Sequence, residues 1–173
     1  RVDYQKEDEI GLLGKEFNEM LDEIQRLIGK EYEKRVDTQL KAVLPNIKTT
    51  QLENGIYLNM IDVEKYAHKF TFPAPGKTCG FVHDRMIKEL GEDKPIVTLG
   101  HGPDFGVFRA TDAVNEEFGF NVNDIVSNLA VKVPSAGVDG GGHECAGSVK
   151  YIEGLGEEIL SEIVNEVKSL SKL

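Results

Sequence analysis

Apolar residues recur in alternating steps of three and four near the start of the chain, which is the spacing of a coiled-coil seam. This seam consists of Ile10, Leu13, Phe17, Met20, Ile24 and Leu27. It stops because the next position is Glu31, and the apolar stripe shifts to Tyr32 and Val36. Pro45 cannot continue a helix, so we expect one long helix that ends near Val43. A single helix leaves its apolar stripe exposed, and this predicts dimerisation or docking on the rest of the chain.

From Lys48 onward, short apolar-alternating runs separated by turn residues indicate a β-sheet. The predicted strands cover residues 49–52, 56–61, 96–101, 106–111 and 145–152. Asn54-Gly55 between the first two runs is a strong hairpin signal. Gly102-Pro103-Asp104 predicts a turn between the third and fourth runs. The sequence therefore predicts strands that pair in neighbouring hairpins.

Helical patterns alternate with these strands. We expect a loop over residues 70–80, a short helix through Val82, Met86, Ile87 and Leu90 that ends at Gly91, and a helix capped by Asn123. The buried face of that second helix comprises Val122, Ile125, Val126, Leu129 and Ala130. A last helix begins at Glu157 and turns Ile159, Leu160, Ile163, Val164, Val167 and Leu170 inward. The fold class is α/β (α+β), with a mixed β-sheet packed against helices and a long helical leader.

A purely structural role explains one segment less well than any other, the run Gly140-Gly141-Gly142-His143. Glycine loses the most backbone freedom on folding, so three in a row indicate a close backbone approach or positive φ angles. Successive unobstructed amides can form a nest for an anion, and His143 adds a donor or a titratable group. The alternative is a tight hairpin turn beside a half-buried histidine.

Composition and charge restrict the classes of function. The 173 residues carry a formal net charge of −10, which argues against strong non-specific binding of duplex DNA. Any nucleic-acid site must therefore be local. Only two cysteines are present, so we expect a reducing, cytoplasmic compartment rather than a disulfide framework. No run is apolar enough for a membrane span, and the start at Arg1 indicates a fragment.

Several motifs suggest sites that we set aside. Pro75-Gly76-Lys77-Thr78 imitates the end of a P-loop, but Thr71 stands where that motif needs glycine. The pairs Cys79 with His83 and His143 with Cys145 contain zinc-ligand types without zinc-finger spacing. We interpret His68 as a surface or packing residue and His83-Asp84 as surface. We therefore predict neither a metal site nor catalytic residues in this chain.

Residues Asp8-Glu9-Ile10-Gly11, then Leu13, Phe17-Asn18 and Met20, resemble the start of the second helix of a HAMP module, the relay of bacterial sensor kinases and chemoreceptors. The resemblance covers about residues 6–35. The first HAMP helix, its connector and a membrane span are missing from this sequence. A generic amphipathic leader is the alternative. We divide the chain into a helical leader, residues 1–36, and a globular domain, residues 37–173.

The globular domain resembles the DHHA1 domain, the C-terminal substrate-binding module of DHH-superfamily phosphoesterases, with archaeal RecJ-like members most similar. The resemblance rests on a strand ending in Phe108-Arg109-Ala110-Thr111, the helix near Asn123, the run at Gly140–His143 and the strand through Ala146-Gly147-Ser148. It implies that Arg109, Gly140, Gly141, Gly142 and His143 bind the phosphates of a nucleic acid or nucleotide. The alternative for Arg109 is an ion pair with Asp112 or Glu116. Phe105 and Phe108 could offer a base a stacking face, and the alternative is that one of them is core.

The resemblance also implies what is missing. DHH enzymes cleave phosphodiesters with two metal ions held by an N-terminal domain with an Asp-His-His signature, which this chain lacks. We expect a detached module of a RecJ-like single-strand exonuclease, in a chain joined from two sources, that binds but does not cut. Mn²⁺ or Mg²⁺ and a DHH catalytic domain would be its partners in hydrolysis. Two alternatives stay open: a metal-dependent phosphodiesterase in its own right, and a signalling or homodimerising helix fused to a carrier domain.

Overall fold

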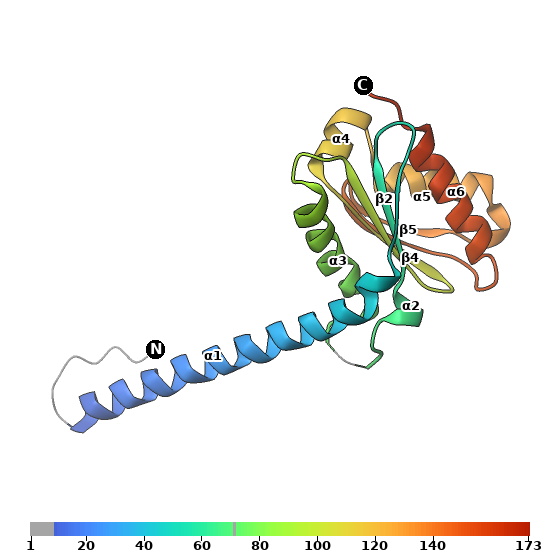
Figure 1. Ribbon diagram of the computed structural model, residues 1–173. Coiled ribbons are helices and arrows are strands. Elements are labelled where there is room, and N and C mark those ends of the chain that lie inside the picture. Colours follow the sequence, from blue (N-terminus) through green and yellow to red (C-terminus); the bar gives the residue numbers. More distant parts are fainter. Residues whose placement is uncertain (1–8, 71) are drawn as a thin grey trace.

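The computed structural model describes residues 9–70 and 72–173, and it shows a mixed α/β domain from which one long helix projects (Figure 1). The sheet has six strands in the order β1-β2-β3-β4-β6-β5. Their bounds are β1 Lys48–Gln51, β2 Tyr57–Asp62, β3 Ile96–His101, β4 Phe105–Ala110, β5 Asp139–His143 and β6 Ala146–Lys150. All neighbours pair antiparallel except β2 and β3. The predicted fold class and both turn-linked hairpins are confirmed.

Helices cover both faces of this sheet. Their bounds are α2 Val63–Tyr66, α3 Pro75–Leu90, α4 Asp112–Phe118, α5 Val122–Lys132 and α6 Gly156–Ser169. The larger core lies between the sheet and α5 and α6, where Phe108, Leu129 and Ile163 are fully buried. The smaller core lies under α3, where Val82 and Met86 pack with Ile61 of β2. Alternate residues of β2 therefore serve opposite cores, with Leu58 in the larger core and Ile61 in the smaller.

The long helix α1 (Glu9–Val43) joins the domain only through its last turns. Gln39 is 1% exposed, and its amide nitrogen donates to the carbonyls of His68 and Pro73. Val43 enters the smaller core, and a 3-10 turn containing Pro45 follows, as predicted. The six seam residues, by contrast, are 44–64% exposed. Docking on the domain is therefore limited to the last turns of α1, and dimerisation stays a prediction, as does the boundary at residue 36.

Several local details differ from our predictions, among them Ala130, which is exposed on α5. Helix α3 begins at Pro75, inside the expected loop, because proline suits the first turn of a helix, where no intrahelical N–H bond is lost. Helices α2 and α4 are absent from our predictions. Asn121, not Asn123, caps α5, accepting a bond from the backbone N–H of Asn123.

The glycine run forms neither the nest nor the tight turn that we considered. Gly140, Gly141 and Gly142 lie in β5, the edge strand, with φ angles of 151°, 137° and 154°. L-residues rarely adopt this region, and a Cβ on Gly142 would lie 2.4 Å from the carbonyl oxygen of Ala146. These three positions therefore need glycine, because Cβ atoms on this backbone path would clash with neighbouring atoms.

Gly142→Ala should destabilise the domain by at least about 2 kcal/mol, through backbone strain and the clash with Ala146. Urea unfolding followed by circular dichroism measures this free energy. Gly76→Ala is the matched control, since a Cβ in helix α3 would meet only Val107 at 3.6 Å. Equal stability of both variants would contradict this account of the glycine run.

Candidate functional site

One cross-strand row brings two predicted site residues to the same face of the sheet. Ala146 of β6 pairs with Arg109 of β4 on one side and with His143 of β5 on the other. Residues opposite each other in neighbouring strands point to the same face, and strands lie about 4.8 Å apart. The Cα atoms of Arg109 and His143 are therefore about 10 Å apart, and their side chains flank a small residue.

Arg109 is half-buried and has no carboxylate partner among the described residues. Its Nη1 donates to the carbonyl of Phe108 at 2.7 Å. Its Nε lies against α3, 3.8 Å from the position that a Cβ would take on Gly80. The alternative pairing with Asp112 or Glu116 does not occur, so most of the guanidinium's donors remain available.

The amides of the glycine run have different surroundings. The side chain of Asn123 accepts a bond from the Gly142 N–H at 3.1 Å and donates to the Gly142 carbonyl at 3.0 Å. Backbone groups alternate in direction along an antiparallel strand, so Gly141 faces the β6 ladder and Gly140 faces the open edge. A three-amide nest is therefore wrong for this run, and only the Gly140 amide points to open space.

Small residues form a floor between the two basic side chains. The row next to Arg109–Ala146–His143 consists of Val107, Ser148 and Gly141. Ser148 and His143 are exposed, and Ala146 and Gly141 are partly exposed. Helix α3 packs on β3 and β4, which leaves this face of β6 and β5 open. The floor therefore admits a ligand between a guanidinium, a hydroxyl and an imidazole.

A chain of buried, hydrogen-bonded polar side chains lies beneath α3, beside Arg109. Asn59 donates to the Thr98 hydroxyl at 3.4 Å, and that hydroxyl lies 2.9 Å from Nδ1 of His83. His83 is 6% exposed, so our surface interpretation of it was wrong. Burial, with the nearby Arg109 charge adding to it, lowers the pKa of His83 to about 4 against the pull of Asp84. The buried, neutral imidazole of His83 shares this hydrogen bond with Thr98 and has a structural role.

The other candidate residues lack the surroundings of a reactive thiolate, a metal site or a P-loop in the described part of the chain. Burial raises the pKa of the Cys79 thiol to about 11, so it is not a reactive thiolate. No group of three or more metal-ligand side chains occurs in residues 9–70 and 72–173. Pro75 to Thr78 form the first turn of α3 rather than a P-loop, and Thr71 lies outside the described residues. His68 is exposed and Phe108 is core, as expected.

Two contributors to the site escaped the sequence analysis. The side-chain bridge from Asn123 to Gly142 joins residues from α5 and β5, and nothing in the sequence signals it. Ser148 could have been found, because alternation around the buried Val149 turns Ser148 to the opposite face.

None of the helices in the described part of the chain is apolar enough to cross a membrane.

Comparison with known proteins shows that this chain is similar to a DHH-domain protein. No family model matches the chain. An uncharacterized protein of Methanocaldococcus jannaschii is 59% identical over 137 residues, which cover 79% of this chain and 18% of that protein. A solved structure described as the DHH domain of a member of a family of ribosomal proteins is 47% identical, with a TM-score of 0.78, and matches 87% of this chain and 33% of that one. The chain thus spans a third or less of these relatives. The HAMP resemblance gains no support, and its residues 6–8 lie outside the described part.

His83 should make stability depend on pH between about 4 and 6.5. Its folded pKa lies below its unfolded value, so the unfolded chain binds the extra proton, and stability falls as pH decreases through this window. The loss is about 1.4 kcal/mol per pH unit at most. Urea unfolding at several pH values should show a shallower decline for His83→Gln than for wild type, and parallel curves would contradict the buried neutral imidazole.

Proposed function

We propose that this chain, which is similar to a DHH-domain protein, binds the phosphates of a single-stranded nucleic acid or nucleotide. The ligand would lie on the open face of β4, β6 and β5, between Arg109 and His143. This is the phosphate-binding part of a RecJ-like phosphoesterase.

The observation that carries the proposal is the half-buried guanidinium of Arg109 without a carboxylate among the described residues. A desolvated cation without a counter-charge is costly, so the fold normally pairs such a group. A ligand phosphate supplies that charge and accepts two parallel N–H bonds from the guanidinium fork. The whole chain has 30 acidic and 20 basic residues, so carboxylates are plentiful. An arginine without a carboxylate partner among the described residues is therefore the more informative.

The other predicted site residues have revised roles in this proposal. His143 donates from the far side of the floor, and the Ser148 hydroxyl adds a donor between them. Gly140 offers its amide at the strand edge. Gly141 and Gly142 contribute mainly by having no side chains, since a phosphate can approach their backbone closely.

We propose that hydrolysis requires a separate DHH catalytic domain with its Mn²⁺ or Mg²⁺ ions. The support is the length of the relatives, of which this chain covers 18% and 33%. Two-metal hydrolysis needs carboxylate and histidine ligands close together. The chain itself would bind and position the substrate strand.

Arg109→Ala should weaken binding of a fluorescein-labelled 12-nucleotide dT strand by about 1–3 kcal/mol, the scale of a lost charge-assisted contact. Fluorescence anisotropy at fixed ionic strength measures the affinity. Arg85→Ala removes an equal charge from the exposed face of α3, where Arg85 pairs with Glu89 at 2.8 Å, and should have little effect. If both variants bind alike, the proposed grip is rejected.

The outer seam of α1 supports dimerisation as a second function. Its six apolar residues are 44–64% exposed, with Ile10 and Ile24 at a positions and Leu13 and Leu27 at d positions. This arrangement favours parallel two-stranded coiled coils. Analytical ultracentrifugation should give a dimer for the whole chain and a monomer for residues 37–173. The same oligomeric state in both would exclude the helix as the dimeriser.

A further inference from the structure

We propose a second contact for the nucleic acid, in which an unpaired base stacks in a groove where α1 meets the start of α3. We call it the junction groove, and it is formed by Leu27, Ile28, Tyr32, Arg35 and Phe72, with Lys77 and Phe81 on α3 beside it. The inference rests on the proposed function, since it concerns the same bound strand. It specifies that the ligand is an oligonucleotide with free bases rather than a lone phosphate compound.

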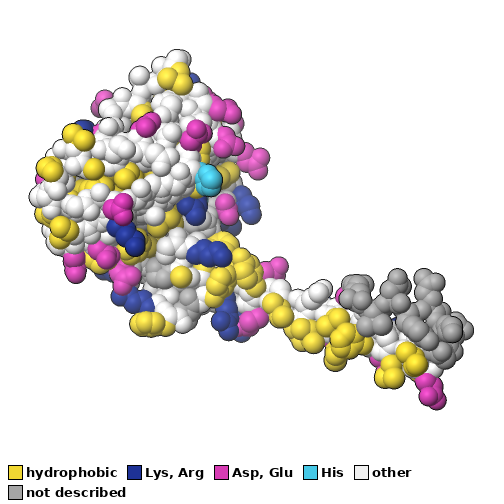
Figure 2. Space-filling model, turned by 180° about the vertical axis from the view of Figure 1, so that it is seen from behind, with side chains coloured by type: hydrophobic (Ala, Val, Ile, Leu, Met, Phe, Trp, Pro, Cys, Tyr) yellow, Lys and Arg dark blue, Asp and Glu magenta, His cyan; other side chains and the backbone are white. Residues whose placement is uncertain are grey.

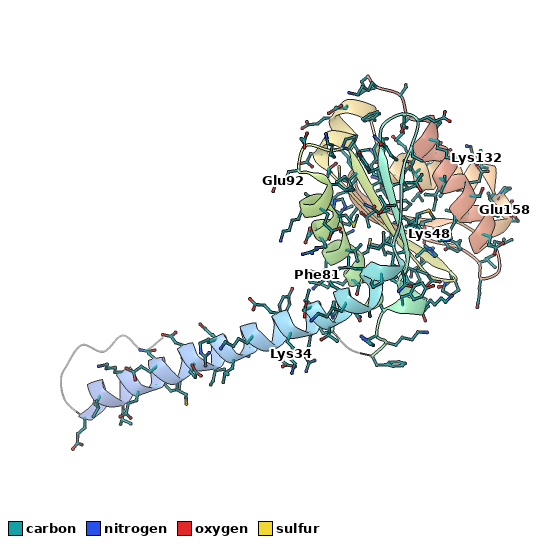
Figure 3. The ribbon with its side chains drawn as sticks, in the orientation of Figure 1. Lys34, Lys48, Phe81, Glu92, Lys132 and Glu158 are labelled. Carbon is teal, nitrogen blue, oxygen red and sulfur yellow. The ribbon has the colours of Figure 1, made fainter. Side chains whose placement is uncertain are left out.

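Two aromatic rings, Tyr32 and Phe72, line the groove, and a third ring, Phe81 of α3, packs against Tyr32. The ring centroids of Tyr32 and Phe72 are 5.0 Å apart, and those of Tyr32 and Phe81 are 6.3 Å apart. Phe81 lies where α3 approaches α1 (Figure 3). Tyr32 nevertheless remains 44% exposed, and a cluster that only anchored α1 to the domain would bury this ring more fully. The exposed part of Tyr32 therefore presents an aromatic surface on which a base can stack.

The wall that carries Phe72 is fixed in place. Gln39 of α1 donates to the carbonyls of His68 and Pro73, which lie on either side of Phe72 in sequence. The side-chain oxygen of Gln39 also accepts from the His68 N–H at 2.7 Å. Three bonds from one buried side chain hold this segment against α1. A prearranged wall lowers the entropic cost of ordering side chains when a ligand binds.

The charge around the groove suits a phosphate backbone. Lys77 lies 5.5 Å from the centre of the Phe72 ring and has no carboxylate partner among the described residues. The one acid that lines the groove, Glu31, accepts a bond from Arg35 at 2.8 Å. Lys34 of α1 lines an adjoining hollow that shares Arg35 and Phe72 with the groove. Cations from both helices therefore border the aromatic wall, with Lys77 on the side of α3.

Helix α3 connects the junction groove to Arg109. Gly80, beside which the Arg109 guanidinium lies, and Phe81, whose ring packs against Tyr32, are consecutive residues and so lie on adjoining faces of the helix. Lys77 precedes them by one turn and lies between these faces. Figure 2 shows the result: on one face of the molecule, a histidine, cationic side chains and an apolar patch at the base of the long helix follow one another. One strand can therefore contact both places.

This arrangement selects single strands. In a duplex, each base stacks on its neighbours and pairs across the helix, so no base can reach an aromatic side chain without being extruded. An unpaired strand offers its bases without that cost, and stacking tolerates any sequence because every base has a π-face. The junction groove accordingly favours single strands without favouring a sequence.

The test compares a dT 12-mer with an abasic 12-mer that carries the same phosphates but no bases. Wild type should bind the dT strand at least about fivefold more tightly, the scale of one stacked base, and Tyr32→Leu should remove this preference while leaving abasic affinity unchanged. Tyr32→Phe keeps the ring and should keep the preference. Leu12→Ala is the control, because Leu12 is 59% exposed on the same helix but lies outside both the groove and the seam.

The outcomes separate the groove from the phosphate grip. Arg109→Ala should weaken both strands equally, and Lys77→Ala should weaken both, while Lys15→Ala on the outer part of α1 does not. If wild type prefers neither strand, or if Tyr32→Leu keeps the preference, the groove is rejected although the grip stands. If Tyr32→Phe loses as much as Tyr32→Leu, ring stacking is rejected. If wild type binds neither strand, both proposals fail.

Discussion

The register of three neighbouring strands, β4, β6 and β5, is the constraint on which the site depends. It places Arg109 and His143 in one row across Ala146, so two residues far apart in sequence face the same side of the sheet. A slip of one residue in either pairing would turn one of them to the opposite face, into the larger core. Helix α3 then holds the Arg109 side chain at Gly80 without supplying a carboxylate from the described residues. The result is a fixed cation at the edge of an open floor.

The glycine backbone of the edge strand β5 leaves room for a ligand to approach. Its three glycines follow positive φ angles that other residues rarely adopt, and Asn123 fixes both backbone groups of Gly142. An unprotected edge strand is prone to pair with other chains. Here the Asn123 side chain occupies part of that edge, while the Gly140 amide remains open. The strand therefore combines protection at one end with a donor at the other.

The sequence predicted much of the fold because local signals agreed with it. Asn54-Gly55 specified the first hairpin, and Pro45 specified the end of α1. The start of α3 was misplaced because proline and glycine mark loops as well as first helical turns. The site was only partly predictable. The likeness of the motifs to a known family led to Arg109 and the glycine run, but spacing alone cannot distinguish a glycine strand from a glycine turn. Likewise, the contacts of Asn123 with Gly142 and of Tyr32 with Phe72 depend on tertiary packing between distant segments.

The most direct test of the central claim is a ¹H–¹⁵N NMR titration of this chain with an unlabelled dT oligonucleotide. The account predicts that the Nε–H signal of Arg109, the amide signal of Gly140 and the imidazole signals of His143 shift together and saturate at one ligand concentration. The Gly141 amide, which is bonded within the sheet, should move least among the three glycines. Shifts confined to other surfaces, with the Arg109 side-chain signal unmoved at saturation, would contradict it.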